Sequence, residues 1–495
     1  MSTPNGNAAG RELSQAKRAL LERRLRGAVG AVTSPPGIPR RERREVAPVS
    51  YVQEESWRLE REGRLPTPFL GTALHFAGRL DLAALARSRD EAVRRHESLR
   101  TNFAFFEGQP AQLIRPFTPG ALSALDLSGA GAPADEARRQ IAREMAAPFD
   151  LERDELFRLR VYKLAAEEYV LLLVLHHLVA DFLSLGLLVG ELGALYEAHV
   201  NGRPAPLPET PVQYGDWAAW QREQVASGAL DSQLSYWRAR LRGCPPALDL
   251  PFARPRPAAR SFSGVSRLRG LPEELSQTLR ELSRRHAVSL YTTLLAAFYA
   301  LVRHYTGRAD IVLGRGIPGR TRSETDGLVG CFVNMLALRT DVGGDPTFLE
   351  LLGRVGETVN GAYANQEVPF AVLARELEPD PDPARPPLVQ LVFNLYGAPP
   401  AQPPAGTRLS VFDLRESRPR QEIALFQDMI FGVNDTGRTL GLELKYNPGL
   451  FDAAAMEEML ADYEALLTAA AADPAARLGE LAAQSGIGRP PAPVV

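Results

Sequence analysis

The spacing of hydrophobic positions changes several times along the chain, which predicts both strands and helices. Residues 169–175 form an unbroken apolar run with valines, as expected of a strand buried on both faces. Residues 80–96 instead place their apolar side chains near one face of a helix: Leu82, Leu85, Ala86 and Val93. Similar patterns predict helices over 183–200, 289–305 and 456–471, and strands over 310–313 and 388–396. The chain therefore belongs to the mixed α/β class.

Proline-rich segments divide the chain. In residues 1–45, a short amphipathic helix with basic residues on its polar face precedes a proline-rich break and a second basic cluster at 40–44. We expect a linker or docking element here, and a solvated helix without a partner is the alternative. Five prolines in residues 245–257 favour a boundary between an N-terminal half, 46–225, and a C-terminal half, 226–480. Residues 481–495 end in a proline-rich linker, which suggests an excised or a small free-standing domain.

Composition excludes several classes of function. A chain of 495 residues exceeds one typical core, and a net charge of -2 gives no general attraction to nucleic acid. The two cysteines, Cys244 and Cys331, lie too far apart for a disulfide framework or a zinc site. The N-terminus lacks the apolar core of a signal peptide, and the longest apolar stretch is too short and polar to span a membrane. We expect a cytoplasmic protein with no bound metal and no nucleic-acid or membrane partner.

The strongest chemical signal is the segment that follows the apolar run, with His176, His177 and Asp181. A strand end holds a side chain rigidly, and a histidine near its ordinary pKa accepts a proton at neutral pH. Asp181 is suited to pair with an arginine or to fix a histidine tautomer. The alternative is a hydrogen-bonded histidine pair without a chemical role, because the HxxxD pattern is common by chance.

This segment resembles the HHxxxDG signature of the chloramphenicol acetyltransferase-like acyltransferases, which include the condensation domains of nonribosomal peptide synthetases. Six other segments are similar to condensation-domain motifs and follow in the same order. They are residues 50–59 (SxAQxxxW), 95–103 (RHExLRTxF), 214–220 (YxDFAxW), 329–334 with Arg339 (IGxFVNxxxxR), 365–370 (HQDxPFE) and 385–388 (RxxxxPL). The chain is identified as a member of that family over roughly residues 48–395.

Two positions depart from the family pattern. Phe182 replaces the glycine after the motif aspartate, where glycine would permit a positive φ or a close backbone approach. Phenylalanine adds bulk beside the expected tunnel and resembles condensation domains with unusual acyl or polyketide donors, whereas Ser184 stands where the family often has serine. The last motif is also weaker, since Ala384 and Pro386 lie in a proline-rich stretch.

The resemblance implies a pseudodimer of two acetyltransferase-like α/β halves arranged as a V, with the active site in a tunnel between them. Upstream donor and downstream acceptor carrier proteins would insert their phosphopantetheine arms from opposite faces. The donor arm would bring an acyl or peptidyl thioester, which includes fatty acyl and polyketide chains, and the acceptor arm an aminoacyl thioester. The domain itself would bind no cofactor.

The resemblance also assigns roles to residues. His177 would be catalytic, as the acceptor of a proton from the attacking amine or as the group that positions this amine. His176 would be structural, and Asp181 would be a structural carboxylate paired with Arg320, with Arg315 as the second candidate. Other motif residues have structural interpretations as well: Leu99 and Phe103 in the core, Arg100 in an ion pair, Trp217 and Trp220 in helix packing, and Asn334 bonded to buried backbone groups.

Two other functions stay open at this point. One is an acyltransferase of the same superfamily that uses coenzyme A donors and alcohol or amine acceptors. The other is a non-catalytic domain that docks carrier proteins, which the retention of His177 disfavours. The epimerisation branch is also disfavoured, because no EGHGRE-like segment is present.

Overall fold

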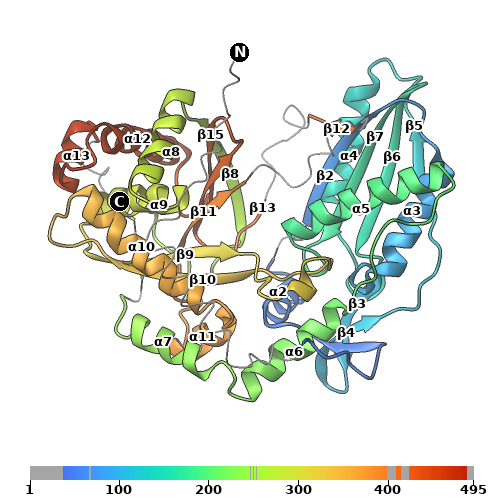
Figure 1. The fold of residues 1–495 in the computed structure, drawn as a ribbon, viewed down its shortest axis with the longest axis horizontal. Helices are drawn as coiled ribbons and strands as arrows, with labels where there is room; N and C mark the ends of the chain where they lie inside the picture. Colours follow the sequence, from blue (N-terminus) through green and yellow to red (C-terminus); the bar gives the residue numbers. More distant parts are fainter. Residues whose placement is uncertain are drawn as a thin grey trace, which may run out of the picture. The chain divides into compact units, whose positions relative to one another are not determined.

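The computed structural model describes residues 37–65, 69–245, 247–248, 250–251, 253–397, 409–413 and 423–487. Residues from Arg40 onward form one compact unit, separate from residues 1–39. This unit contains three β-sheets and the helices that cover them (Figure 1). The amphipathic helix expected near the N-terminus and residues 488–495 lie outside the described residues.

A five-stranded sheet carries the histidine segment. Its strand order is β12 (Leu409–Val411), β2 (Phe69–Ala77), β7 (Glu168–His176), β6 (Phe157–Ala165) and β5 (Ser123–Asp126). Alternate residues of β7 contribute to two different clusters of buried side chains. Leu171, Leu173 and Leu175 pack with α3 (Leu82–Arg95) and α5 (Phe182–Val200), whereas Val170, Leu172 and Val174 pack with α4 (Pro133–Ala146) (Figure 1). Burial on both faces explains the unbroken apolar run of this strand.

Smaller elements connect this sheet to the rest of the unit. A three-stranded sheet is formed by β1 (Val46–Pro48), β4 (Gln109–Ile114) and β3 (Thr101–Phe106), with the short helix η1 (Glu97–Arg100) before β3. Helix α2 (Tyr51–Arg61) begins with a capping box, in which Ser50 and Gln53 bond each other's backbone N–H groups. Helices α6 (Tyr214–Ala226) and α7 (Asp231–Leu241) follow α5 in the chain.

A seven-stranded mixed sheet dominates the second half of the sequence. Its order is β10 (Asn334–Asp341), β9 (Asp310–Ile317), β11 (Leu391–Tyr396), β14 (Met429–Asp435), β15 (Leu440–Tyr446), β8 (Ser263–Gly270) and β13 (Ile423–Ala424). Its helices are α8 (Glu273–Arg285), α9 (Leu290–Thr306), η2 (Ser323–Thr325), α10 (Phe348–Ala364), α11 (Phe370–Leu377), α12 (Ala453–Ala472) and α13 (Leu478–Gln484).

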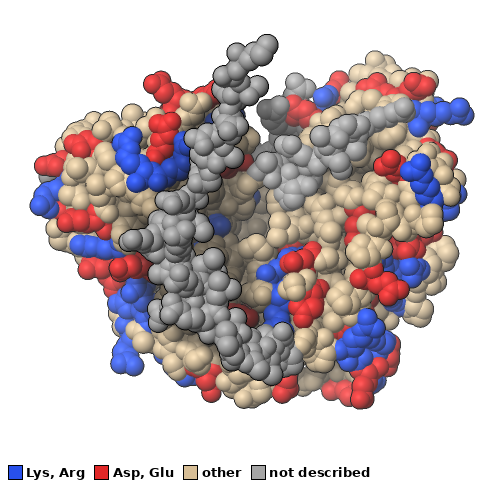
Figure 2. Space-filling model, viewed as in Figure 1, with Lys and Arg blue, Asp and Glu red and all other residues tan. Residues whose placement is uncertain are grey.

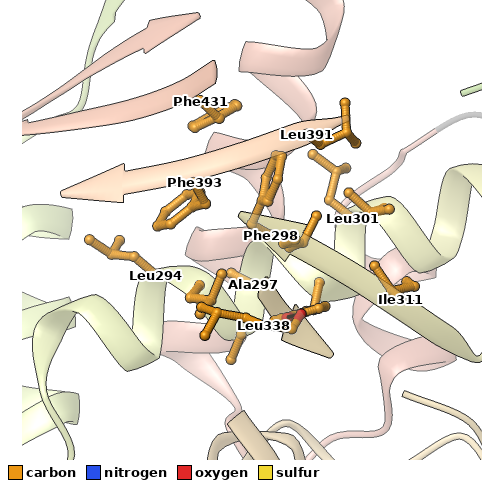
Figure 3. Packing of buried hydrophobic residues seen from close by; sticks show 14 of the residues in the cluster. Leu294, Ala297, Phe298, Leu301, Ile311, Leu338, Leu391, Phe393 and Phe431 are labelled. Atoms are coloured by element: carbon orange, nitrogen blue, oxygen red, sulfur yellow. Dashed lines mark hydrogen bonds between the residues drawn. The ribbon is translucent and has the colours of Figure 1, made fainter. Parts of the chain in front are cut away.

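The core of this second region is centred on α9. Figure 3 shows Phe298 of α9 among side chains of the sheet, with its ring 5.1 Å from that of Phe393 and 4.9 Å from that of Phe431. Each such fully buried side chain contributes about 1.5–3 kcal/mol to folding. Ser289 caps the start of α9, and Gly307 ends it with a positive φ of 65°, which glycine adopts without strain.

The structure confirms all seven helices and strands expected from the hydrophobic pattern, with ends shifted by a few residues. Strand β9 is longer than expected and continues to Ile317, and helix α13 extends past residue 480, where we expected a linker. The linker prediction is wrong at this point because Leu478 and Leu481 are buried in the core.

The prediction for residues 40–45 is also wrong. Arg41 is only 8% exposed and pairs with Glu97 at 2.7 Å and Asp216 at 2.8 Å, while Arg44 pairs with Asp216 at 3.1 Å. The two carboxylates are almost fully buried and require positive partners, which this basic cluster supplies. Residues 40–45 are therefore part of the main unit, which begins at Arg40.

The surface of the described residues is mixed in charge. Figure 2 shows basic and acidic side chains interspersed on one face, without a large area of a single sign. This pattern agrees with the small net charge of the sequence. Among the described helices, none combines the length and the apolar character needed to cross a membrane.

Candidate active site

The loop between β7 and α5 holds the central histidine. It begins at His177 and ends at Asp181, which caps the N-terminus of α5 by accepting a hydrogen bond from the Ser184 N–H group at 2.7 Å. His177 is half-buried, and its Nδ1 atom lies 3.5 Å from Cys331 Sγ. Within the described residues, no hydrogen bond involves its Nε2 atom, so this atom is available to a substrate.

Burial shapes the acid–base properties of this histidine. Desolvation lowers the pKa of His177 below its ordinary value of 6.5, because burial penalises the charged ring. The carbonyl groups of His177 and Ala180 and the charge of Asp181 oppose this shift without cancelling it. The ring is therefore neutral at physiological pH, the state in which it can accept a proton. Burial also raises the pKa of the neighbouring Cys331, which keeps its thiol protonated.

His176 is fully buried and points to the opposite side of the loop. Its Nδ1 atom accepts a hydrogen bond from the Leu178 N–H group at 3.2 Å, so the proton of the neutral ring is on Nε2. Nε2 donates to the carboxylate of Glu60 at 3.1 Å, and the ring meets Phe149 edge-on. All polar atoms of the ring are thus used inside the protein, which agrees with the structural role expected for this residue.

Asp181 is 1% exposed and holds three segments of the chain together. Its Oδ1 atom accepts hydrogen bonds from the Ser184 N–H and hydroxyl groups at 2.7 and 2.8 Å and from Arg320 Nη2 at 3.3 Å. Its Oδ2 atom accepts from the Phe332 N–H group at 3.2 Å. The carboxylate therefore fixes the start of α5 against residues 320 and 332.

Arg320 is the arginine partner that the sequence order suggested. It also donates to Ser184 Oγ at 2.8 Å and to the Thr325 carbonyl, and its guanidinium lies 4.1 Å above the Phe332 ring. Arg315, the second candidate, lies elsewhere: it contacts Asn394 at 3.3 Å and stacks on Tyr291. The ion pair between Asp181 and Arg320 thus matches the first expectation.

Ser184 joins the start of α5 to the segment around residue 330. Its hydroxyl oxygen accepts a hydrogen bond from the Gly330 N–H group at 3.0 Å and lies 2.8 Å from the Gly330 carbonyl. The Tyr214 hydroxyl donates to the Cys331 carbonyl at 2.6 Å and lies 2.9 Å from Ser50 Oγ. A Cβ atom on residue 330 would lie 2.0 Å from the Tyr214 ring, so this close approach requires glycine.

Phe182 differs from the other predicted site residues. It is the first residue of α5, and its side chain is 45% exposed. Its backbone is helical and has no positive φ, so phenylalanine meets no strain at this position. The structure does not bring its ring together with the other site residues, and its effect on the choice of donor stays a prediction.

Asn334 has a structural position. Its amide nitrogen donates to the carbonyls of Gln366 and Val368 at 3.0 and 2.8 Å, and its Oδ1 atom accepts from the Phe370 N–H group at 2.9 Å. These bonds join the start of β10 to the start of α11. They use the polar groups of the side chain on the backbone, as the structural interpretation of this residue expected.

The remaining motif residues divide in the same way. Trp217 packs against Tyr214 and Phe332, as expected of a side chain in helix packing. The prediction that Arg100 forms an ion pair is wrong: it donates to the Arg115 carbonyl, and no described carboxylate lies within salt-bridge distance. The reason is that Glu97, the nearest carboxylate, is already paired with Arg41.

Sequence reasoning missed two residues that support the histidine loop. Glu60, in the last turn of α2, orients His176, and Gln53 of the same helix donates to the Leu178 carbonyl at 2.7 Å. Gln53 lies within the segment that resembles the SxAQxxxW motif, which was the available signal. Glu60 carried no signal, because a glutamate among arginines at the end of a polar helix is typical of a solvated surface.

Comparison with known proteins places the chain among the acyltransferases that form amide bonds. The model of the condensation domain family matches residues 43–485, so the chain belongs to this family. A linear gramicidin synthase from Brevibacillus parabrevis is 40% identical over 450 residues, which cover 90% of this chain and 6% of that protein. The chain therefore spans only a small part of this synthetase.

Solved structures show the same fold. The X-domain from teicoplanin biosynthesis has a TM-score of 0.79 and 26% identity, with coverage of 90% of this chain and 99% of that one. The first condensation domain of the CDA synthetase has a TM-score of 0.72 and 23% identity, with coverage of 88% and 98%. The fold class is thus that of condensation domains, as the motifs implied.

Proposed function

We propose that this condensation domain joins a carrier-bound acyl or peptidyl thioester to the amine of a carrier-bound aminoacyl thioester, with His177 as the proton acceptor. The observation that carries this proposal is a half-buried histidine with a lowered pKa whose Nε2 atom makes no hydrogen bond within the described residues. The carrier proteins supply both thioesters on their phosphopantetheine arms, and fatty acyl and polyketide donors are included.

The proposed reaction is an aminolysis. The amine nitrogen attacks the thioester carbonyl, a C–N bond forms, and the C–S bond breaks. Nε2 of His177 accepts the proton that the nitrogen loses, and this proton then passes to the departing sulfur as the thiol forms. General base assistance of this kind contributes about 10²–10⁴-fold in rate. The alignment of two tethered reactants contributes about 7–11 kcal/mol at most.

The other site residues have supporting roles in this proposal. His176 and Glu60 fix one side of the loop, and Asp181 with Arg320 fixes the other. Because these groups are bonded to one another, His177 is the residue of the motif with a ring atom left for the substrate. Phe182 is assigned a part in the choice of donor, since its exposed ring begins the helix next to the loop.

We also propose that the chain is divided into halves at 46–225 and 226–480. In support, strands β2, β5, β6 and β7 of the five-stranded sheet all precede residue 177, and the strands of the seven-stranded sheet all follow residue 262. Strand β12 departs from this division, because it pairs with β2 from the second part of the sequence.

A second candidate function is a docking domain without catalysis. The X-domain from teicoplanin biosynthesis has been crystallised in complex with OxyB, and it covers 90% of this chain at a TM-score of 0.78. A domain of this fold can therefore serve as a binding platform. The intact histidine loop favours the catalytic function over this one.

A condensation assay tests the proposal. The purified chain is mixed with a carrier protein loaded with an acyl group and a second carrier loaded with an aminoacyl group, and new amide is detected by mass spectrometry. We expect product on the acceptor carrier and a rate about 10²–10⁴-fold lower for His177→Ala. His286→Ala, at the end of α8, is the matched control and should keep the wild-type rate.

The outcomes separate the two candidate functions. Product with the wild type and little with His177→Ala supports catalysis, provided that both proteins unfold at the same temperature. An unchanged rate in His177→Ala refutes the role of this residue as the base. Binding of loaded carriers without product from acyl or peptidyl donors supports the docking function.

A further inference from the structure

A second pocket, separate from the histidine loop, is lined mainly by arginines. Its volume is about 460 Å³, within the range of sites that bind small molecules. Its walls come from the segment before β1, from η1 and the end of β4, and from the start of α6. The basic residues that line it are Arg40, Arg44, Arg100 and Arg115. None of the predicted site residues contributes to it.

The carboxylates of this pocket already have partners. Glu97 is paired with Arg41 at 2.7 Å, and Asp216 is paired with both Arg41 and Arg44. Glu45, which is exposed, is paired with Arg43 at 3.3 Å. The acidic residues of the walls therefore have little charge left to neutralise further arginines.

Three arginines of the pocket lack a carboxylate partner among the described residues. Arg40 donates to the Pro211 carbonyl at 2.7 Å, Arg115 donates to the Glu152 carbonyl at 2.9 Å, and Arg100 donates to the Arg115 carbonyl. The Nε atom of Arg100 is buried without a hydrogen-bond partner. Each guanidinium has five N–H donors, so these carbonyls satisfy only part of its capacity.

The position of Arg100 indicates that an anion is missing from its surroundings. Burial lowers the pKa of its guanidinium, Glu97 opposes this shift, and the positive charge of Arg41 adds to it. A half-buried cation beside another cation is costly unless an anion compensates its charge. A ligand with negative charge would therefore gain from Arg100, Arg40 and Arg115 together.

We propose that this pocket binds a phosphate group. A phosphate ester carries between one and two negative charges and three acceptor oxygens, which suits three guanidinium groups better than a single carboxylate does. The hydroxyl oxygen of Thr210 accepts a hydrogen bond from Gln213 at 2.9 Å, so its proton can be donated into the pocket. The volume leaves room for the group that the phosphate is attached to.

Calorimetric titration of the whole chain tests this site with three probes. Inorganic phosphate represents a free anion, 4′-phosphopantetheine represents a phosphate ester of the kind on carrier proteins, and pantetheine lacks the phosphate. We expect both phosphate compounds to bind in Arg115→Gln about tenfold more weakly than in the wild type. Arg40→Gln should give a similar loss, and pantetheine should not compete for the site.

Arg203→Gln is the matched control, because Arg203 is exposed, lies outside the pocket and has no ion pair among the described residues. It should keep wild-type affinity for phosphate. Failure of both phosphate compounds to bind the wild type overturns the proposal, and so does binding that is equally strong in Arg40→Gln and Arg115→Gln. These results are independent of the condensation reaction, because the rate of amide formation is not the readout.

Discussion

The substitution Asp181→Asn tests whether the motif aspartate acts through structure. Asparagine has nearly the same shape but no charge, and its side-chain NH2 group is a donor. If its oxygen keeps the contacts with Ser184 and Arg320, the NH2 group faces the Phe332 N–H group, which now meets Oδ2 at 3.2 Å. Two donors then oppose each other, and the guanidinium of Arg320 loses its counter-charge.

The structure sets the size of the expected effect. The side chains of Asp181 and Arg320 are 2% and 7% exposed, so water cannot replace the lost interaction. Removal of one member of a buried ion pair costs about 3–5 kcal/mol, since the other charge stays buried and unpaired. This is a large fraction of the roughly 5–15 kcal/mol that stabilises a typical folded protein. We therefore expect a lower folded yield and a lower unfolding midpoint, together with a lower rate.

Urea unfolding followed by tryptophan fluorescence measures this loss. Trp217 is a local reporter, because its ring lies 4.7 Å from that of Phe332. The double variant Asp181→Asn/Arg320→Met should recover part of the stability, since the unpaired cation is also removed. Asp126→Asn is the control: this exposed aspartate pairs only with Lys163, and its replacement should change stability little. A loss of rate with unchanged stability in Asp181→Asn would refute the structural role.

Three further predictions concern the same loop. Because burial lowers the pKa of His177 below 6.5, the acidic limb of the rate profile should lie below that pH, and the stability that its neutral form contributes should be present above pH 6.5 and lost as the pH falls through the lowered pKa; a kcat/KM profile with its limb at or above 6.5 contradicts this. Cys331→Ala removes a side chain that excludes water from the ring, so the limb should move toward 6.5 in the same assay. Gly330→Ala should cost about 1–3 kcal/mol in urea unfolding, because its methyl group would overlap the Tyr214 ring, and wild-type stability would show that the ring moves aside.

The sequence predicts best where the pattern is local. The run that became β7 is apolar at every position because both of its faces are covered, so its length and composition were sufficient. Strand β12 shows the opposite case. It has three residues, two of them exposed, and it pairs with β2 more than 300 residues earlier in the chain. A segment this short has no periodicity from which its partner can be inferred.

The candidate site shows the same contrast. The pairing of Asp181 with Arg320 followed from the family motifs, because both residues lie in segments with expected positions. Arg41 misled the interpretation, since an arginine in a basic cluster beside prolines is usually solvated. Its partners, Glu97 and Asp216, are 56 and 175 residues away. Ion pairs over such separations depend on the tertiary fold and leave no mark in the local spacing.

The two histidines of the motif have different tasks because the loop between them and α5 is fixed from both sides. On one side, Glu60 and the Leu178 N–H group occupy both nitrogens of His176. On the other, Asp181 accepts four hydrogen bonds and holds the start of α5. A loop restrained in this way keeps the His177 ring in place at little entropic cost when a substrate arrives. The buried polar groups around the loop therefore serve the position of one atom, Nε2 of His177, and their replacement should lower the rate even where His177 itself is unchanged.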